Sequence, residues 1–180
     1  QNEILWMQQV APTFGQTLTA ENLAPVLGVR ADQIDQRFPV EEVSTGLPFI
    51  IVPLVDLEAI RDCRIDQAAF LQLISQTEAK SLFVFCPETY SAKNHINARM
   101  FDPYHGIAED PATGSANGCL AAYLVKNLYY DQLKLEIRVE QGYEIGRPSL
   151  LLLKAEEIPG RPISVKVGGS VVMVARGELF

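Results

Sequence analysis

The segment from Gly114 to Val125, GSANGCLAAYLV, is a helix candidate that contains no charged residue. A helix on the surface of a globular protein normally keeps one polar face, so a helix that is uncharged all round has to be enclosed by other elements. The small residues Gly114, Ala116 and Gly118 allow those elements to approach closely. We therefore expect a buried helix at the centre of the fold.

Short β-rich segments surround this helix in the sequence. Strands are expected at 3–10, 40–44, 48–52, 81–86, 96–101, 133–139, 150–155, 163–167 and 171–175, with Gly168–Gly169 as a hairpin turn between the last two. Helical segments are expected at 19–27, with Thr19 as the N-cap and Gly28 beyond the end, and at 31–36, 54–60 and 66–75. Because strands do not alternate regularly with long helices, the fold class expected is α+β, a strongly curved mixed β-sheet wrapped around the central helix.

The composition argues against several classes of protein. A chain of 180 residues with 48% hydrophobic residues can bury one sizeable core, and its net charge of -7 argues against sequence-independent binding of nucleic acid. The apolar runs are too short for a membrane-spanning helix. Cys63, Cys86 and Cys119 lie far apart, which fits neither a metal site nor a disulfide framework. We expect three buried, reduced thiols in a cytoplasmic protein.

Polar residues gather directly before the uncharged helix, between Arg99 and Ser115. Pro111 restricts Asp110 to an extended conformation, and the residues that follow place backbone N–H groups and hydroxyls at a helix N-terminus, where anions bind. Asp110 could exchange a proton with such an anion. Asp and Thr before a helix are also ordinary caps, so spacing alone favours capping over catalysis. Expected burial favours catalysis, because unused polar groups at a buried helix mouth are unfavourable.

The same residues resemble the signature of the isomerases of the phenazine-biosynthesis F (PhzF) type. The resemblance rests on Arg99, on Phe101 and on the run EDPATGSA at 109–116, and two further segments agree with it: VSTGLP at 43–48, and Gln141–Gly142 with GRPS at 146–149. These isomerases are similar in fold to diaminopimelate epimerase, in which two lobes each wrap a sheet around a central helix. The resemblance covers the chain from end to end.

The resemblance implies an acid–base isomerisation that needs no cofactor, on a small carboxylate-bearing substrate for which dihydro-hydroxyanthranilate is the prototype. Asp110 carries over as the catalytic acid–base group. The substrate-binding residues that it implies are Thr113, Gly114, Ser115, Ser44 and Arg99. The catalytic Glu that faces this Asp in the family belongs to an N-terminal lobe, as does a Phe-x-Gly-Asn-Pro motif, and this sequence contains neither. Two facing carboxyl groups make chemical sense, since one can accept a proton while the other donates one.

We therefore expect residues 1–12 to be the closing strand of a missing N-terminal lobe and residues 13–180 to be a C-terminal PhzF-like lobe. The site would be completed by that lobe or by a second chain, and a homodimer is expected. The strand at 3–10 should then be an unpartnered edge, which exposes Ile4, Leu5, Trp6 and Met7. Two alternatives stay open: a module that holds a small carboxylate without chemistry, and a structural fragment that dimerises.

Overall fold

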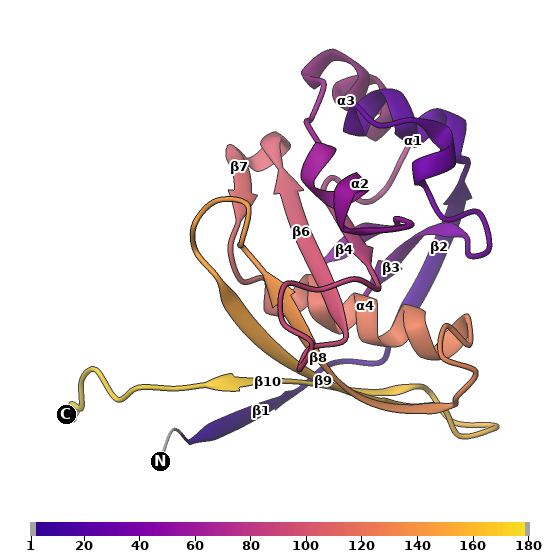
Figure 1. The fold of residues 1–180 in the computed structure, drawn as a ribbon. Helices are drawn as coiled ribbons and strands as arrows, with labels where there is room; N and C mark the ends of the chain where they lie inside the picture. The colour runs from indigo at the N-terminus through magenta and orange to yellow at the C-terminus, as the bar shows by residue number, and fades with distance from the viewer. Residues whose placement is uncertain (1–2, 179–180) are drawn as a thin grey trace.

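In the computed structural model, which describes residues 3–178, ten strands form one continuous mixed sheet (Figure 1). The strands run in the order β1-β10-β9-β8-β6-β5-β4-β3-β2, with β7 paired to β6. The pairs β4–β5 and β6–β8 are parallel and the others are antiparallel. The strands are β1 (Ile4–Gln8), β2 (Thr13–Leu18), β3 (Val40–Ser44), β4 (Pro48–Pro53), β5 (Leu82–Cys86), β6 (Ile96–Asp102), β7 (Ile107–Asp110), β8 (Lys134–Gln141), β9 (Ser149–Glu156) and β10 (Ser164–Ser170).

The sheet curves around helix α4 (Gly114–Lys126), which contacts β3 and β4 on one side and β8, β9 and β10 on the other (Figure 1). Every residue of α4 from Ala116 to Val125 is buried. Their apolar side chains pack with Phe85 of β5, Val139 of β8 and Leu153 of β9 in one core. The expectation of a strongly curved sheet around a buried helix is confirmed. As the uncharged sequence of α4 indicates, the helix is enclosed by other elements and no position on it faces only water.

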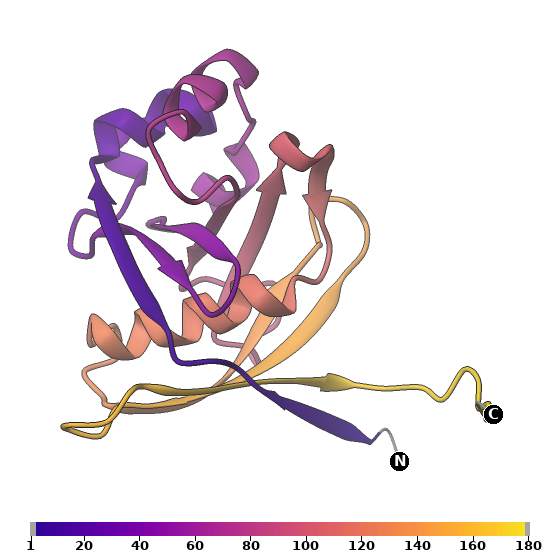
Figure 2. The same ribbon diagram turned by 180° about the vertical axis from the view of Figure 1, so that it is seen from behind.

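Three further helices, α1 (Ala20–Leu27), α2 (Leu57–Asp62) and α3 (Gln67–Ile74), cover the convex face of the sheet beside β4 and β5 (Figures 1 and 2). Their apolar side chains form a second core, with Leu23 of α1, Ile60 of α2 and Phe70 of α3 all fully buried. The strands β4 and β5 are therefore covered on both faces. This explains why β5 has the continuous apolar sequence LFVFC instead of an alternating one.

Local capping decides where these helices begin and end. Thr19 accepts a hydrogen bond from the Asn22 N–H at 3.3 Å, and Gly28 adopts a left-handed conformation beyond the end of α1, as expected. The helix expected at 54–60 begins instead at Leu57, because Asp56 accepts from the Ala59 N–H at 2.8 Å and acts as its cap. A single 3₁₀ turn at Ala31–Gln33 replaces the helical segment expected at 31–36.

The strand predictions missed two strands and misplaced the end of a third. β2 and β7 were not expected. Gly15 interrupts the strand-like sequence pattern of β2, and β7 lies in a polar segment of the sequence. The hairpin turn at Gly168–Gly169 is wrong: both glycines lie inside β10, and residues 171–175 are not a strand. A Cβ on Gly168 would lie 2.8 Å from the ring of Trp6, so glycine here permits a close approach between strands instead of a turn.

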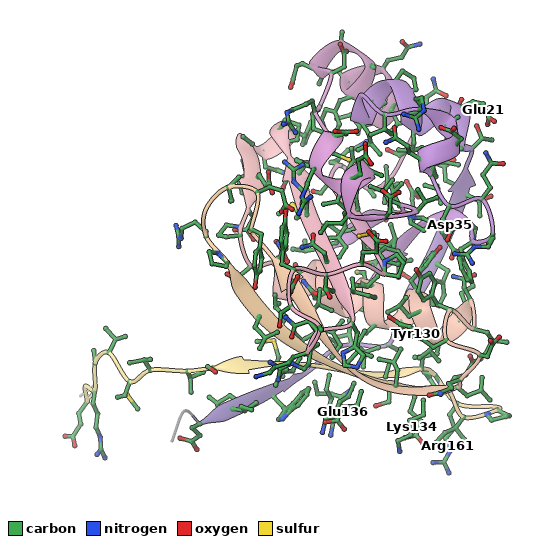
Figure 3. All side chains as sticks on the ribbon, in the orientation of Figure 1. Glu21, Asp35, Tyr130, Lys134, Glu136 and Arg161 are labelled. Atoms are coloured by element: carbon green, nitrogen blue, oxygen red, sulfur yellow. The ribbon has the colours of Figure 1, made fainter. Side chains whose placement is uncertain are left out.

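The strand β1 and the C-terminal part of β10 project from the body of the molecule as a two-stranded arm (Figures 1 and 2), while Val165 and Val167 of β10 belong to the core around α4. As expected, β1 is an edge strand with every residue exposed, but it is not unpartnered, because it pairs along its length with β10. Beyond β9, the strand β8 turns its apolar residues toward α4, while the exposed Lys134 and Glu136 point away from it (Figure 3). Within the described residues, none of the helices combines the length and apolar character that a membrane-crossing helix needs.

Candidate functional site

The site predicted from the sequence lies where β7 ends and α4 begins. The backbone turns at Pro111 and Ala112, and Thr113 is the N-cap residue of α4. Thr113 does not cap the helix with its side chain. Because the first N–H groups of an α-helix have no partner within the helix, the N–H groups of Gly114 and Ser115 remain available to an anion.

The start of α4 opens into a groove of about 950 Å³ between the helix and the two-stranded arm. Most of its wall is apolar, as Leu5, Trp6 and Leu150 show. Its polar lining comes from the first turn of α4 and from Gln9, Ser149 and Ser170. A mostly apolar groove with a few convergent polar groups is the usual form of a small-molecule site.

The carboxylate of Asp110, which is half-buried at the end of β7, lies beside this helix start. Its Oδ2 accepts a hydrogen bond from the hydroxyl of Thr113. Thr113 itself is buried, and its backbone N–H donates to the side chain of Gln141 at 3.2 Å. The structure thus brings Asp110 and Thr113 together with Gly114 and Ser115. However, both donors of Thr113 already have partners within the protein, so its role in substrate binding stays a prediction.

Gln141, at the end of β8, is a site residue that the sequence reasoning did not select. It is fully buried, and its Nε2 donates to the backbone oxygen of Asp110 at 2.7 Å and to Oγ1 of Thr113 at 3.0 Å. Its Oε1 accepts from the N–H of Thr113 and from Nδ2 of Asn117, the latter at 2.9 Å. The sequence did offer a signal for this residue, because the Gln141–Gly142 pair is part of the resemblance to PhzF-type isomerases. That resemblance, however, assigned no role to Gln141.

Arg99, a predicted substrate-binding residue, is buried on β6 with its side chain only 6% exposed. Its Nε and Nη2 bind the two carboxylate oxygens of Glu109 at 3.0 and 2.7 Å, and its Nη1 donates to the backbone oxygens of Ile60 and Cys63. Burial opposes the charge, but the paired hydrogen bonds to Glu109 outweigh it and hold the pKa of Arg99 above its usual value. These contacts tie β6 to β7 and to the end of α2. Substrate binding by Arg99 stays a prediction, and its observed contacts favour a structural role.

Ser44, the remaining predicted binding residue, is the last residue of β3, directly before the turn to β4. Its hydroxyl accepts from the N–H of Gly46 at 3.1 Å within that turn. The neighbouring Thr45 contacts α4, with its Oγ1 3.5 Å from the backbone oxygen of Ser115 and 3.6 Å from Sγ of Cys119. The turn therefore lies against the first turns of α4, but no hydrogen bond joins Ser44 to Asp110 or Ser115 within the described residues. Its role in substrate binding also stays a prediction.

The three cysteines are free and buried, as expected. Burial raises the pKa of the Cys119 thiol to about 11, and it raises the pKa values of Cys63 and Cys86 to about 12. A thiol with such a pKa is protonated at neutral pH and is a poor nucleophile. The high pKa values therefore argue against a thiolate as the acid–base group, and the catalytic role of Asp110 stays a prediction.

A family model described as "PhzC-PhzF: Phenazine biosynthesis-like protein" matches residues 1–177 of this chain. The trans-2,3-dihydro-3-hydroxyanthranilate isomerase of Pseudomonas aeruginosa is 32% identical over 176 residues, which cover 97% of this chain and 58% of that protein. An uncharacterized isomerase of Bacillus subtilis is 32% identical over 168 residues, which cover 92% of this chain and 56% of that protein. The chain thus spans less than two thirds of the length of these relatives.

Two solved structures share the fold. A phenazine biosynthesis protein of the PhzF family from Bacillus anthracis superposes with a TM-score of 0.81 at 29% identity, covering 93% of this chain and 57% of that one. A protein from Pseudomonas aeruginosa described as a predicted epimerase superposes with a TM-score of 0.72 at 30% identity, covering 98% of this chain and 58% of that one. The expected fold class is confirmed by these similarities.

Proposed function

Because this chain belongs to the phenazine biosynthesis-like family, PhzC-PhzF, we propose that it forms one side of the active site of an isomerase that moves a proton on a small carboxylate-bearing substrate. The observation that carries the proposal is the carboxylate of Asp110, held by Thr113 directly beside the uncapped start of α4. The helix start opens onto the groove at Gly114 and Ser115. Asp110 precedes it in the chain and is hydrogen-bonded to Thr113, so a proton-transfer group lies beside an anion-binding helix start.

In this proposal the substrate carboxylate binds the N–H groups of Gly114 and Ser115, with the Ser115 hydroxyl as a third donor. These donors stabilise the negative charge that develops when a proton leaves a carbon atom conjugated with the carboxylate. Asp110 then takes up or returns the proton at a second position of the substrate. The apolar wall around Trp6 and Leu150 excludes water and accommodates the carbon skeleton.

The second acid–base group of the reaction comes, in this proposal, from outside the chain, and the resemblance to PhzF-type isomerases implies a glutamate of an N-terminal lobe. The chain spans 58% of the Pseudomonas isomerase, which leaves room for such a lobe in that relative. The assignment of residues 1–12 to that lobe, the homodimer and the absence of a cofactor remain predictions.

Replacement of Asp110 by Asn tests the catalytic role. In the protein that joins this chain to the remaining lobe, Asp110→Asn keeps the shape of the side chain but removes its proton transfer, so we expect turnover to fall by roughly 10²–10⁴-fold. Deuterium incorporation at a substrate carbon, followed by NMR, measures the loss. Asp66→Asn is the matched control, since Asp66 only caps α3, accepting from the Ala69 N–H at 2.8 Å. Normal turnover in Asp110→Asn would return Asp110 to a capping role and favour a carboxylate-binding module.

Purification of the 180-residue chain alone tests the proposal that it holds half a site. We expect no deuterium incorporation above the buffer rate, because the second acid–base group is absent. We also expect self-association through the exposed edge of β1, where Met7 is 68% exposed, and analytical ultracentrifugation measures it. Met7→Lys should weaken the association, whereas Leu71→Lys on α3 should leave it unchanged. Catalysis by the chain alone would show that the site is complete without another lobe.

A further inference from the structure

The side-chain amide of Gln141 can take only one orientation. The backbone oxygen of Asp110 can only accept a hydrogen bond, so the atom 2.7 Å from it must be Nε2 of Gln141. The backbone N–H of Thr113 can only donate, so the atom 3.2 Å from it must be Oε1. Two backbone groups, one of each kind, therefore determine which end of the amide faces which partner.

Asn117 supports the same orientation independently. Its Nδ2 lies 2.9 Å from the backbone oxygen of Thr113, which can only accept, and 2.9 Å from Oε1 of Gln141. The amide nitrogen of Asn117 thus donates to both atoms, and Oε1 of Gln141 acts as an acceptor twice. A reversed Gln141 amide would bring two donors together at Asn117 and two more at Thr113.

The orientation of Gln141 determines the direction of the next hydrogen bond. Nε2 of Gln141 donates to Oγ1 of Thr113 at 3.0 Å, so the Thr113 hydroxyl is an acceptor on that side. Its single proton is then directed to Oδ2 of Asp110. The hydrogen bonds therefore run one way, from Gln141 through Thr113 to Asp110.

We propose that Gln141 is a positioning residue that acts through Thr113 to make Oδ1 of Asp110 the oxygen that exchanges the proton with the substrate. Oδ2 is occupied by the Thr113 hydroxyl, while no group among residues 3–178 donates to Oδ1. A proton that leaves the substrate carbon bonds to Oδ1, and the same O–H bond breaks when the proton is returned. The proton of Thr113 stays on its own oxygen throughout. This inference rests on the catalytic role proposed above for Asp110.

Two pairs of variants test it by turnover in the protein that joins this chain to the remaining lobe. Gln141→Glu keeps the length and the acceptor oxygen but removes both donated hydrogen bonds, and Thr113→Val keeps the shape but removes the hydroxyl. Because a displacement of about 1 Å can cost about 10²-fold in rate, we expect kcat to fall by roughly that factor in both variants with KM unchanged. Thr113→Ser keeps the hydroxyl and should retain most of the turnover. Gln33→Glu is the matched control, since Gln33 also binds a backbone N–H, that of Arg30 at 2.9 Å, but in the η1 turn (Ala31–Gln33).

A second measurement on the 180-residue chain does not depend on activity. The hydroxyl proton of residue 113 should exchange slowly with water in the wild-type chain and in Thr113→Ser, and Gln141→Glu should lose this protection in NMR spectra. Wild-type turnover in Thr113→Val, or protection that persists in Gln141→Glu, would overturn the inference. If Asp110→Asn loses turnover while Thr113→Val does not, only this inference is wrong. If both keep turnover, the proposed function is wrong as well.

Discussion

Gly142 permits a contact on which the candidate site depends. It follows Gln141 directly and adopts φ +81°, which is unfavourable for other residues. A Cβ at this position would lie 2.4 Å from the backbone oxygen of Arg147 and 2.9 Å from that of Pro111. The loop after β8 can therefore lie against the turn that leads into α4 only because residue 142 has no side chain.

Gly142→Ala should destabilise the protein more than Gly146→Ala does. Both glycines have positive φ, so each substitution carries a conformational penalty of about 1–2 kcal/mol. Only at Gly142 does the new methyl group meet backbone atoms, since nothing lies within 4 Å of a Cβ at Gly146. We expect overpacking to add about 1–3 kcal/mol at Gly142 alone, measured by urea unfolding. Equal losses in the two variants would show that the loop can move away from Pro111.

The two-stranded arm is an element whose pairing depends on a side chain fitting against backbone. The Trp6 ring lies over Gly168, and Nζ of Lys154 lies 4.4 Å from the ring centroid. The register of the arm pairs Trp6 with Gly168 and Leu5 with Gly169. A bulky ring on β1 is thus matched by a missing side chain on β10, and this match explains why the Gly-Gly pair is not a turn.

Gly168→Ala should displace Trp6, whereas Gly169→Ala should not. A methyl group at 168 would approach the ring to 2.8 Å, and nothing lies within 4 Å of a Cβ at 169. Trp6 is the only tryptophan in the sequence, so its fluorescence reports on the arm directly. We expect a red-shifted emission and faster amide exchange in β1 for Gly168→Ala, with Gly169→Ala resembling the wild type. An unchanged emission maximum in both variants would contradict the close contact.

At the scale of the whole molecule, two apolar cores on opposite faces of one sheet bury ionisable groups that stay neutral at physiological pH. Cys63 and Cys86 lie in the core beneath α1–α3, and Cys119 lies in the core around α4. Burial raises the pKa of all three thiols from their ordinary 9.0, and it raises the pKa of Tyr130 to about 12. The fold therefore disfavours the charged forms of these groups. Because these charged forms appear only at alkaline pH, the stability of the folded chain should depend on pH in that range.

The free energy of unfolding should fall as pH rises from about 9 toward 12. In this window the unfolded chain has lost thiol protons that the folded chain retains, so the unfolded state binds fewer protons and a rise in pH favours it. The stabilisation is complete below pH 9 and is lost as the pH passes through the folded-state values, by at most about 1.4 kcal/mol per thiol and pH unit. Denaturant unfolding from pH 7 to 10.5 measures the fall. A chain with Cys63→Ala, Cys86→Ala and Cys119→Ala should show a shallower slope, and an equal slope would contradict the assignment to thiols.

The sequence by itself determined the features that depend on neighbouring residues or on a repeated pattern. The uncharged run at 114–125 required a helix surrounded on all sides, and Thr19 and Gly28 marked the ends of α1 through contacts within one turn. The run from Glu109 to Ala116 located the candidate site for the same reason, since Asp110 and Thr113 are three residues apart.

Only the tertiary structure decided which polar groups have partners, because those partners lie far apart in the sequence. Gln141 reaches Thr113 across 28 residues, and Arg99 reaches the backbone of Ile60 across 39. A local pattern cannot distinguish an arginine that meets a substrate from one that binds buried carbonyls, since both need the same guanidinium. The same limit applies to Gly168–Gly169, which is typical of a turn until β1 places Trp6 against it. Hydrogen bonds and close contacts depend on where groups lie in space, and for residues far apart in the sequence only the folded sheet sets those positions.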